Sequence, residues 1–221
     1  MNITHAVSEE VVGDKMLAIF ARQKELMEKY HDIEARSGLL QTEDCPVNLH
    51  DKRGQARLKD FAWRVTEEVG EALDAVIVHN DDVHFYEELI DGLHFLTEFS
   101  ILAGFDPEVF RTTLSAKVKN KDDIFDMAYE YFQIIEQGSK PSLATLVTQL
   151  IMELGMTCNC LKNKPWKQTN MLTDIPMFYS NLIKTWLSYL HLLFRFMTPT
   201  EVTDVYLKKS QVNKFRQRSN Y

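Results

Sequence analysis

Six carboxylates flank the short stretch VHNDD, with Glu67, Glu68 and Glu71 before it and Glu87, Glu88 and Asp91 after it. At 100° per residue, the first three lie within an arc of about 100° on one helix. Glu88 and Asp91 are three residues apart, so they share a face of the next helix. A turn this short makes the two helices antiparallel neighbours, and their acidic faces can meet.

Converging carboxylates repel one another unless a cation lies between them. Ligation by oxygen alone suits Mg²⁺ or Mn²⁺, and Mg²⁺ commonly shares its ligand shell with substrate phosphates. The acids therefore predict a divalent cation and a phosphate-bearing substrate. The alternative is a solvated helix surface, because glutamate is common on helices.

A basic group of residues follows near the end of the sequence. Lys209, Asn213 and Arg216 are spaced i, i+4 and i+7, so they share one helix face, and Tyr221 follows five residues later. A cation, an amide, a guanidinium and a phenol in this order can bind a polyphosphate and part of a base. The alternative is a basic helix end that interacts with the helix dipole or a nearby acidic surface.

Composition limits the class of protein. The chain has 221 residues, of which 45% are apolar and 26% charged, which is typical of a globular protein of one or two domains. A net charge of -7 argues against broad electrostatic binding to nucleic acid. The first residues show no secretory pattern, and the longest apolar run is too short for a bilayer. Three cysteines are typical of reduced thiols in a cytosolic protein, so we expect a cytoplasmic location without a membrane partner.

The apolar residues recur every three to four positions and no alternating strand pattern is found, so we predict an all-α helical bundle in a single domain, 1–221. We expect helices over 14–35, 55–78, 82–104, 143–162 and 175–197. Two shorter helices are expected between them, one capped by Asp106 and Pro107 and one ending at Gly138. The last helix begins at the capping box Thr198 to Glu201.

The sequence also contains an internal repeat. DDVHFYEELIDGLHFLTEFSILAGFDPEVF aligns with TDIPMFYSNLIKTWLSYLHLLFRFMTPTEV, and upstream RVTEEVGEAL aligns with QLIMELGMTC. The acids are not kept in the second copy, where the positions of Glu71, Glu88 and Asp91 hold Met156, Asn181 and Lys184. We therefore predict two related helical hairpins, an acidic one within 54–120 and a degenerate one within 142–221. The alternative is the general likeness of any two amphipathic helices.

The segments QKELMEKY, EEVGEALDA, EELIDGLHFL and YLKKSQVNKFRQRSNY resemble the all-α nucleoside triphosphate pyrophosphatases. The resemblance is closest to the dimeric dUTPase branch, especially its phage members. MazG and the dCTP pyrophosphatases are more distant relatives. The similarity extends from about Ile19 to Tyr221. The two acidic motifs are shared across the superfamily, whereas the C-terminal string is more specific to the dUTPase branch.

This resemblance implies the hydrolysis of dUTP to dUMP and pyrophosphate by a Mg²⁺-dependent homodimer, with Mn²⁺ as a possible substitute. It implies a metal site formed by Glu68, Glu71, Glu88 and Asp91. Glu67 matches the acid that positions or deprotonates the attacking water. The implied nucleotide contacts are His94 near the base, Gln23 in the wall of the nucleotide pocket, Asn213 at the pyrimidine, and Lys209, Arg216 and Tyr221 at the phosphates.

One departure from the family leaves alternatives open. The related enzymes have a Trp-rich segment between the acidic helices, where this chain has only VIVHNDDVHF. Trp166 either replaces it or is a packing aromatic. A pyrophosphatase for dCTP or a broader set of nucleotides is an alternative, as is a helical scaffold that binds nucleotide or protein without turnover. A di-iron bundle would need Glu-x-x-His on two helices, and only Asp91-x-x-His94 comes near.

Overall fold

The structure is a computed structural model that describes residues 6–119 and 121–218. Throughout these residues the regular elements are helical, which confirms the all-α prediction. The elements are α1 (Lys15–Ser37), α2 (Lys52–Asp74), a π-helical turn (Ala75–His79), α3 (Asp82–Leu102), α4 (Val109–Ser115), α5 (Ile124–Ile135), α6 (Leu143–Asn159), α7 (Ile175–Phe194) and α8 (Pro199–Arg218).

Two predicted helix ends are confirmed in atomic detail. Thr198 and Glu201 form the capping box of α8, because Glu201 Oε2 accepts from the Thr198 amide at 2.7 Å and Thr198 Oγ1 accepts from the Glu201 amide at 3.3 Å. Gly104 ends α3 with φ of 70°, a left-handed conformation that glycine adopts without steric cost. These ends fix where the chain enters α8 and leaves α3.

Other boundaries differ from the prediction. Helix α2 begins at Lys52, because Asp51 accepts from the amides of Arg53 and Gly54, and it changes to a π-helical turn at Ala75. Helix α4 begins at Val109 and not at Pro107. Asp106 does accept from the Glu108 amide at 3.0 Å, but this bond forms a turn ahead of the helix.

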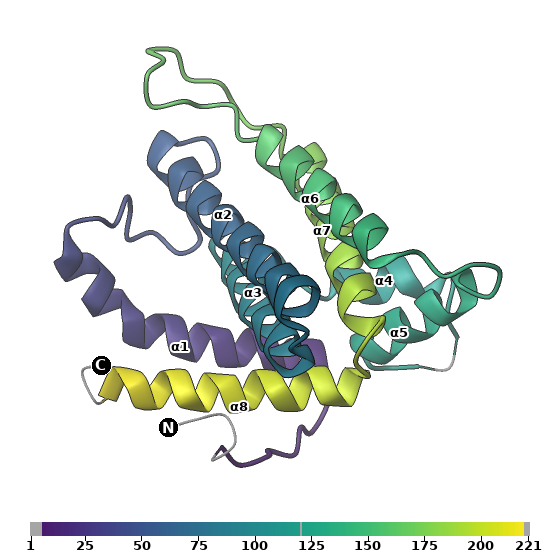
Figure 1. Ribbon diagram of the computed structural model, residues 1–221. Coiled ribbons are helices and arrows are strands. Elements are labelled where there is room, and N and C mark those ends of the chain that lie inside the picture. Colours follow the sequence, from purple (N-terminus) through teal and green to yellow (C-terminus); the bar gives the residue numbers. More distant parts are fainter. Residues whose placement is uncertain (1–5, 120, 219–221) are drawn as a thin grey trace.

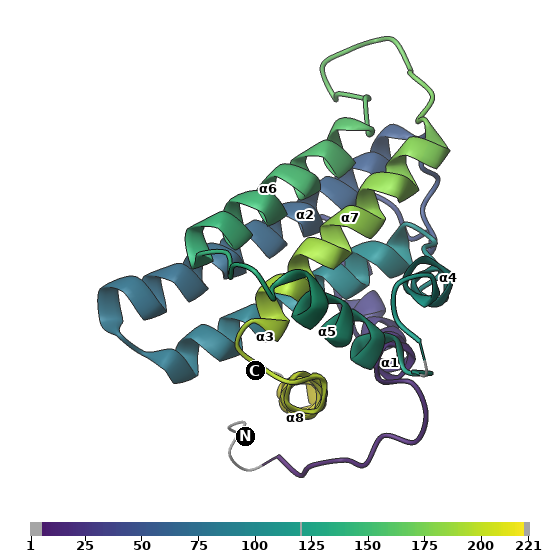
Figure 2. The same cartoon turned by 90° about the vertical axis from the view of Figure 1, so that its right-hand side faces the viewer.

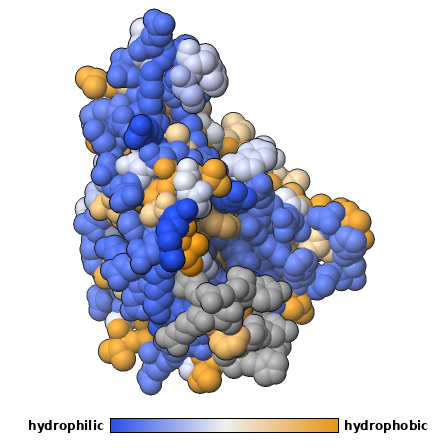
Figure 3. Space-filling view, turned by 90° about the vertical axis from the view of Figure 1, so that its left-hand side faces the viewer, coloured by the Kyte–Doolittle hydropathy of each residue, from blue (hydrophilic) through white to orange (hydrophobic). Residues whose placement is uncertain are grey.

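The helices form two hairpins and a supporting pair. Helices α2 and α3 pack along each other, as do α6 and α7, and α1 and α8 lie side by side across the α2/α3 hairpin (Figures 1 and 2). The face shown in Figure 3 is mainly hydrophilic, with apolar residues in small separate groups. Among the described helices, none is long and apolar enough to cross a membrane.

A close approach in the core positions the acidic helices. Tyr189 of α7 is fully buried, and its hydroxyl donates to the Leu89 carbonyl of α3 at 2.7 Å. A Cβ atom on Gly92 would lie 2.3 Å from that hydroxyl and 3.3 Å from the Cβ atom of Glu68. Glycine at this position therefore lets α3 approach both α7 and the acidic face of α2.

Candidate metal and nucleotide site

The acidic faces of α2 and α3 meet. Carboxylate oxygens of Glu68 and Glu71, from α2, and of Glu88, from α3, lie within 4.8 Å of one another. Glu88 is buried, Glu68 is half-buried and Glu71 is exposed. The cluster thus has a closed inner side and an open outer side.

The charges in this cluster oppose one another. The pKa of Glu68 is raised to about 8, chiefly by burial, then by a hydrogen bond with Glu88 and by the negative charges of Asp91, Glu88 and Glu71. At neutral pH, Glu68 therefore keeps a proton in the absence of a cation. Carboxylate oxygens this close together repel one another when all are ionised. They fit a hard divalent cation, which would replace the proton on Glu68.

Asp91, the fourth predicted ligand, is held by a lysine from another helix. Lys209 of α8 places its Nζ 2.7 Å from Asp91 Oδ2. Burial raises the pKa of Asp91, and the charge of Lys209 and its hydrogen bond act against that rise. The structure therefore joins the acidic hairpin to the basic C-terminal helix through a half-buried ion pair.

Glu67, the predicted proton acceptor, lies outside this three-carboxylate cluster. Its Oε1 accepts from Trp63 Nε1 at 2.7 Å, and its Oε2 accepts from Arg64 Nη1 at 2.9 Å. Sequence reasoning missed both partners, although spacings of four and three residues on one helix would have indicated them. It also missed His84, whose Nδ1 lies 3.1 Å from Glu88 Oε1.

A cavity of about 450 Å³ opens beside Glu68 and Asp91. It is formed by α1, α2, α3 and α8, and seven residues named from the sequence line it: Gln23, Glu68, Asp91, His94, Lys209, Asn213 and Arg216. Glu67, Glu71 and Glu88 do not line it. Tyr221 lies outside the described residues, so its predicted phosphate contact stays a prediction.

A buried polar chain lines the inner wall of this cavity. Gln23 Nε2 donates to Glu98 Oε2 at 2.8 Å, and Gln23 Oε1 lies 2.9 Å from His94 Nδ1. The pKa of His94 is lowered to about 3, first by burial and then by the charge of Lys209, against a weaker opposing contact from the backbone of Tyr206. The His94 ring is therefore neutral at physiological pH. Glu98 was not singled out from the sequence, although it follows His94 by one helical turn.

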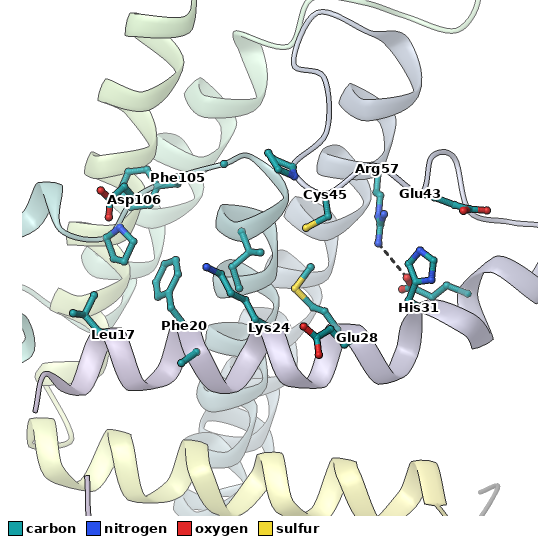
Figure 4. A pocket seen from close by; sticks show the side chains of 17 residues that line it. Leu17, Phe20, Lys24, Glu28, His31, Glu43, Cys45, Arg57, Phe105 and Asp106 are labelled. Carbon is teal, nitrogen blue, oxygen red and sulfur yellow. Dashed lines mark hydrogen bonds and ion pairs between the residues drawn. The ribbon is translucent and has the colours of Figure 1, made fainter. Parts of the chain in front are cut away.

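A larger cavity, of about 970 Å³, lies between α1, the chain around Cys45 and the turn after α3 (Figure 4). The ion pair of Arg57 and Glu34, at 3.1 Å, crosses one end of it. Glu34 lines both cavities, so this pair stands between them. Trp166 lines neither cavity and is 77% exposed, so it does not pack in the core, and its role in place of the Trp-rich segment stays a prediction.

Comparison with known proteins gives one match. A model of the family described as dUTPase matches residues 68–221, a span that begins at the acidic cluster and includes α8. Searches of curated proteins and of solved structures found no match.

Proposed function

We propose that this chain, which belongs to the dUTPase family, hydrolyses dUTP to dUMP and pyrophosphate with Mg²⁺ or Mn²⁺. The observation that supports this most is the pairing of two features. The three-carboxylate cluster of Glu68, Glu71 and Glu88 lies at one side, and a cavity lined by the cationic and amide side chains of α8 lies beside it.

The cluster and Asp91 would hold the cation. When bound, a divalent cation neutralises phosphate charge and lowers the pKa of a water molecule. Substrate binding would then break the ion pair of Asp91 and Lys209. The Lys209 ammonium would then face a phosphate, and the Asp91 carboxylate would be available as a further oxygen ligand. Binding of nucleotide and cation is therefore expected to be mutually favourable.

The remaining roles follow from position. Arg216 lies two helical turns from Lys209, so the two charged heads can bind phosphates about 10 Å apart along the helix axis. Asn213, between them, offers both a donor and an acceptor to the edge of a pyrimidine. Glu67 accepts the proton of the attacking water, after one of its bonds from Trp63 or Arg64 is exchanged.

The proposal extends to the assembly and the base. We expect a homodimer, as in the dimeric dUTPases that the chain resembles, and light scattering of the purified protein tests this. Because the Trp-rich segment is missing, a preference for dCTP or for several nucleotides is the second candidate within the same reaction class. A scaffold that binds nucleotide without turnover is the candidate from another class.

The decisive assay measures pyrophosphate release from each deoxy- and ribonucleoside triphosphate, with Mg²⁺ and with Mn²⁺. We expect the highest kcat/KM for dUTP and complete loss of turnover with a chelator. Equal rates for dUTP and dCTP would favour the broad-specificity enzyme. Nucleotide binding without pyrophosphate release would instead support the scaffold.

A further inference from the structure

Behind the cavity, four buried polar side chains from three helices form one hydrogen-bonded chain. Gln23 is 2% exposed, His94 5%, Glu98 8% and Tyr206 0%. The proposed reaction assigns no part to Glu98 or Tyr206. Buried polar groups of this kind must satisfy one another, so the chain has a defined direction of donors and acceptors.

That direction can be followed from Glu98. An ionised carboxylate only accepts hydrogen bonds, so the Gln23 amide must turn its nitrogen towards Glu98, and the two atoms are 2.8 Å apart. The amide oxygen of Gln23 then faces the opposite way. It accepts from the Tyr206 hydroxyl at 2.7 Å and lies 2.9 Å from His94 Nδ1.

The orientation of this amide determines the tautomer of His94. A carbonyl oxygen cannot donate, so the proton of the neutral imidazole must lie on Nδ1, and Nε2 is left as an acceptor. Nε2 is buried and has no hydrogen-bond partner within the described part of the chain. The ring is held by stacking on Tyr206, with centroids 3.7 Å apart. A buried acceptor without a partner is unfavourable, and a donor on a bound ligand would relieve this.

We propose that Glu98 is a positioning residue that orients the Gln23 amide and thereby fixes His94 as a hydrogen-bond acceptor in the wall of the nucleotide cavity. The effect of this orientation on base selection rests on the proposed function. The ligand it favours is a base that presents an N–H group to this wall. Uracil has such a group at N3, whereas cytosine has an unprotonated N3 that would face the His94 lone pair.

The surroundings of Glu98 determine its protonation, and its protonation determines the donor and acceptor direction of these hydrogen bonds. The pKa of Glu98 is raised to about 7, first by burial and then by the charge of Glu34, while the hydrogen bond with Gln23 and the charge of Arg57 act against this rise. Protonated Glu98 could donate to a reversed Gln23 amide, which would reverse every bond in the chain. The direction described here is therefore the one expected above neutral pH, where Glu98 is ionised.

The test reads the tautomer directly. Long-range ¹H–¹⁵N correlation spectra of the full chain, without nucleotide at pH 8.5, distinguish a protonated ring nitrogen from a bare one. The His94 signals are identified by their loss in His94→Phe. We expect a proton on Nδ1 and none on Nε2 in the wild type. A proton on Nε2 overturns the proposal.

Variants then test Glu98 itself. Glu98→Leu keeps a similar volume but has no acceptor, so we expect a mixture of both His94 tautomers. Glu98→Gln, which retains one acceptor oxygen, is expected to lie between Glu98→Leu and the wild type. Glu43→Gln, which removes an exposed carboxylate outside the chain of hydrogen bonds, is the matched control and should leave the spectrum unchanged. An unaltered tautomer in Glu98→Leu overturns the positioning role.

The kinetic measurement is the ratio of kcat/KM for dUTP to that for dCTP. We expect Glu98→Leu to lower this ratio about tenfold, the effect of losing one hydrogen bond in a buried site. An unchanged ratio alongside an altered tautomer would overturn the link to base selection. If no nucleotide is turned over by the wild type, the proposed function fails, while the spectra still decide the relay from Glu98 to His94.

Discussion

The α2/α3 hairpin and the α6/α7 hairpin have opposite kinds of contacts at aligned positions, charged in the first and neutral in the second. In the first, Glu68 and Glu88 share a hydrogen bond within a cluster of like charges. In the second, the position of Glu88 holds Asn181, whose amide reaches the Met156 carbonyl at 3.4 Å and Cys160 Sγ at 3.5 Å. The second contact set is neutral and satisfied internally.

The contacts between the paired helices differ in the same sense. At the position of Gly92, the second hairpin holds Thr185, whose hydroxyl lies 2.9 Å from that of Thr157 on the facing helix. The first hairpin has no side chain there and admits the Tyr189 hydroxyl instead. Like charges held close in the first hairpin lower stability unless a cation is present. The contacts of the first hairpin therefore suit a bound ligand, whereas those of the second suit packing. The relation of the two hairpins by duplication stays a prediction.

The largest effect is expected from removing a carboxylate of the first hairpin. Glu71→Gln and Asp91→Asn should each lower kcat/KM by about a thousandfold, because cation ligation supplies several kcal/mol of transition-state stabilisation. Glu153→Gln alters the second-hairpin acid that aligns with Glu68 and whose carboxylate accepts from Gln149 Nε2, so it is the control and should retain full activity. Circular dichroism should show every variant folded. Near wild-type turnover by either of the first two would refute the metal site.

The C-terminal helix should give the next effect. Arg216→Ala is expected to reduce kcat/KM about 10- to 100-fold for every nucleotide, since a charged hydrogen bond to phosphate has no base preference. Asn213→Ala should instead change the ratio between dUTP and dCTP. If both variants lowered kcat/KM equally for dUTP and dCTP, α8 would not have separate residues for phosphate and for base.

These positions show how far the sequence could lead. Glu68, Glu71 and Glu88 were predictable as neighbours, because their spacing on two helices and the short turn between them are local features. The pairing of Lys209 with Asp91, and of Gln23 with Glu98 and Tyr206, joins residues far apart in the chain. Such contacts depend on how α1 and α8 cross the hairpin, which periodicity does not specify.

A smaller effect, on stability, is expected at the close approach of α3 and α7. Gly92→Ala places a methyl group against the Tyr189 hydroxyl, and overpacking of this kind costs about 1–3 kcal/mol. We expect Tm to fall by about 2–10 °C. Adding Tyr189→Phe removes the obstructing oxygen and should recover part of the loss. A wild-type Tm for Gly92→Ala alone would show that the helices can separate without cost.

The smallest effect is a pH-dependent change in Tm. The folded-state pKa of Glu68, about 8, exceeds the ordinary value of 4.5, so its contribution favours folding at low pH and is lost as pH rises towards 8. Mg²⁺ must displace that proton, so its stabilising effect should be larger at pH 8.5 than at pH 6. Thermal melts with Mg²⁺ and with chelator at both pH values measure this. In Glu68→Gln the pH dependence of the metal-free protein should be weaker, and an unchanged dependence would assign it to other groups.

The most direct measurement locates the cation. Crystals grown with Mn²⁺ and a non-hydrolysable dUTP analogue, measured for anomalous scattering, would show where each ion binds. We predict anomalous peaks within the carboxylates of Glu68, Glu71 and Glu88, and none between Glu153 and Asn181. Peaks at the second hairpin, or none at the first with nucleotide bound, would contradict the proposal that only the first hairpin is a catalytic metal centre.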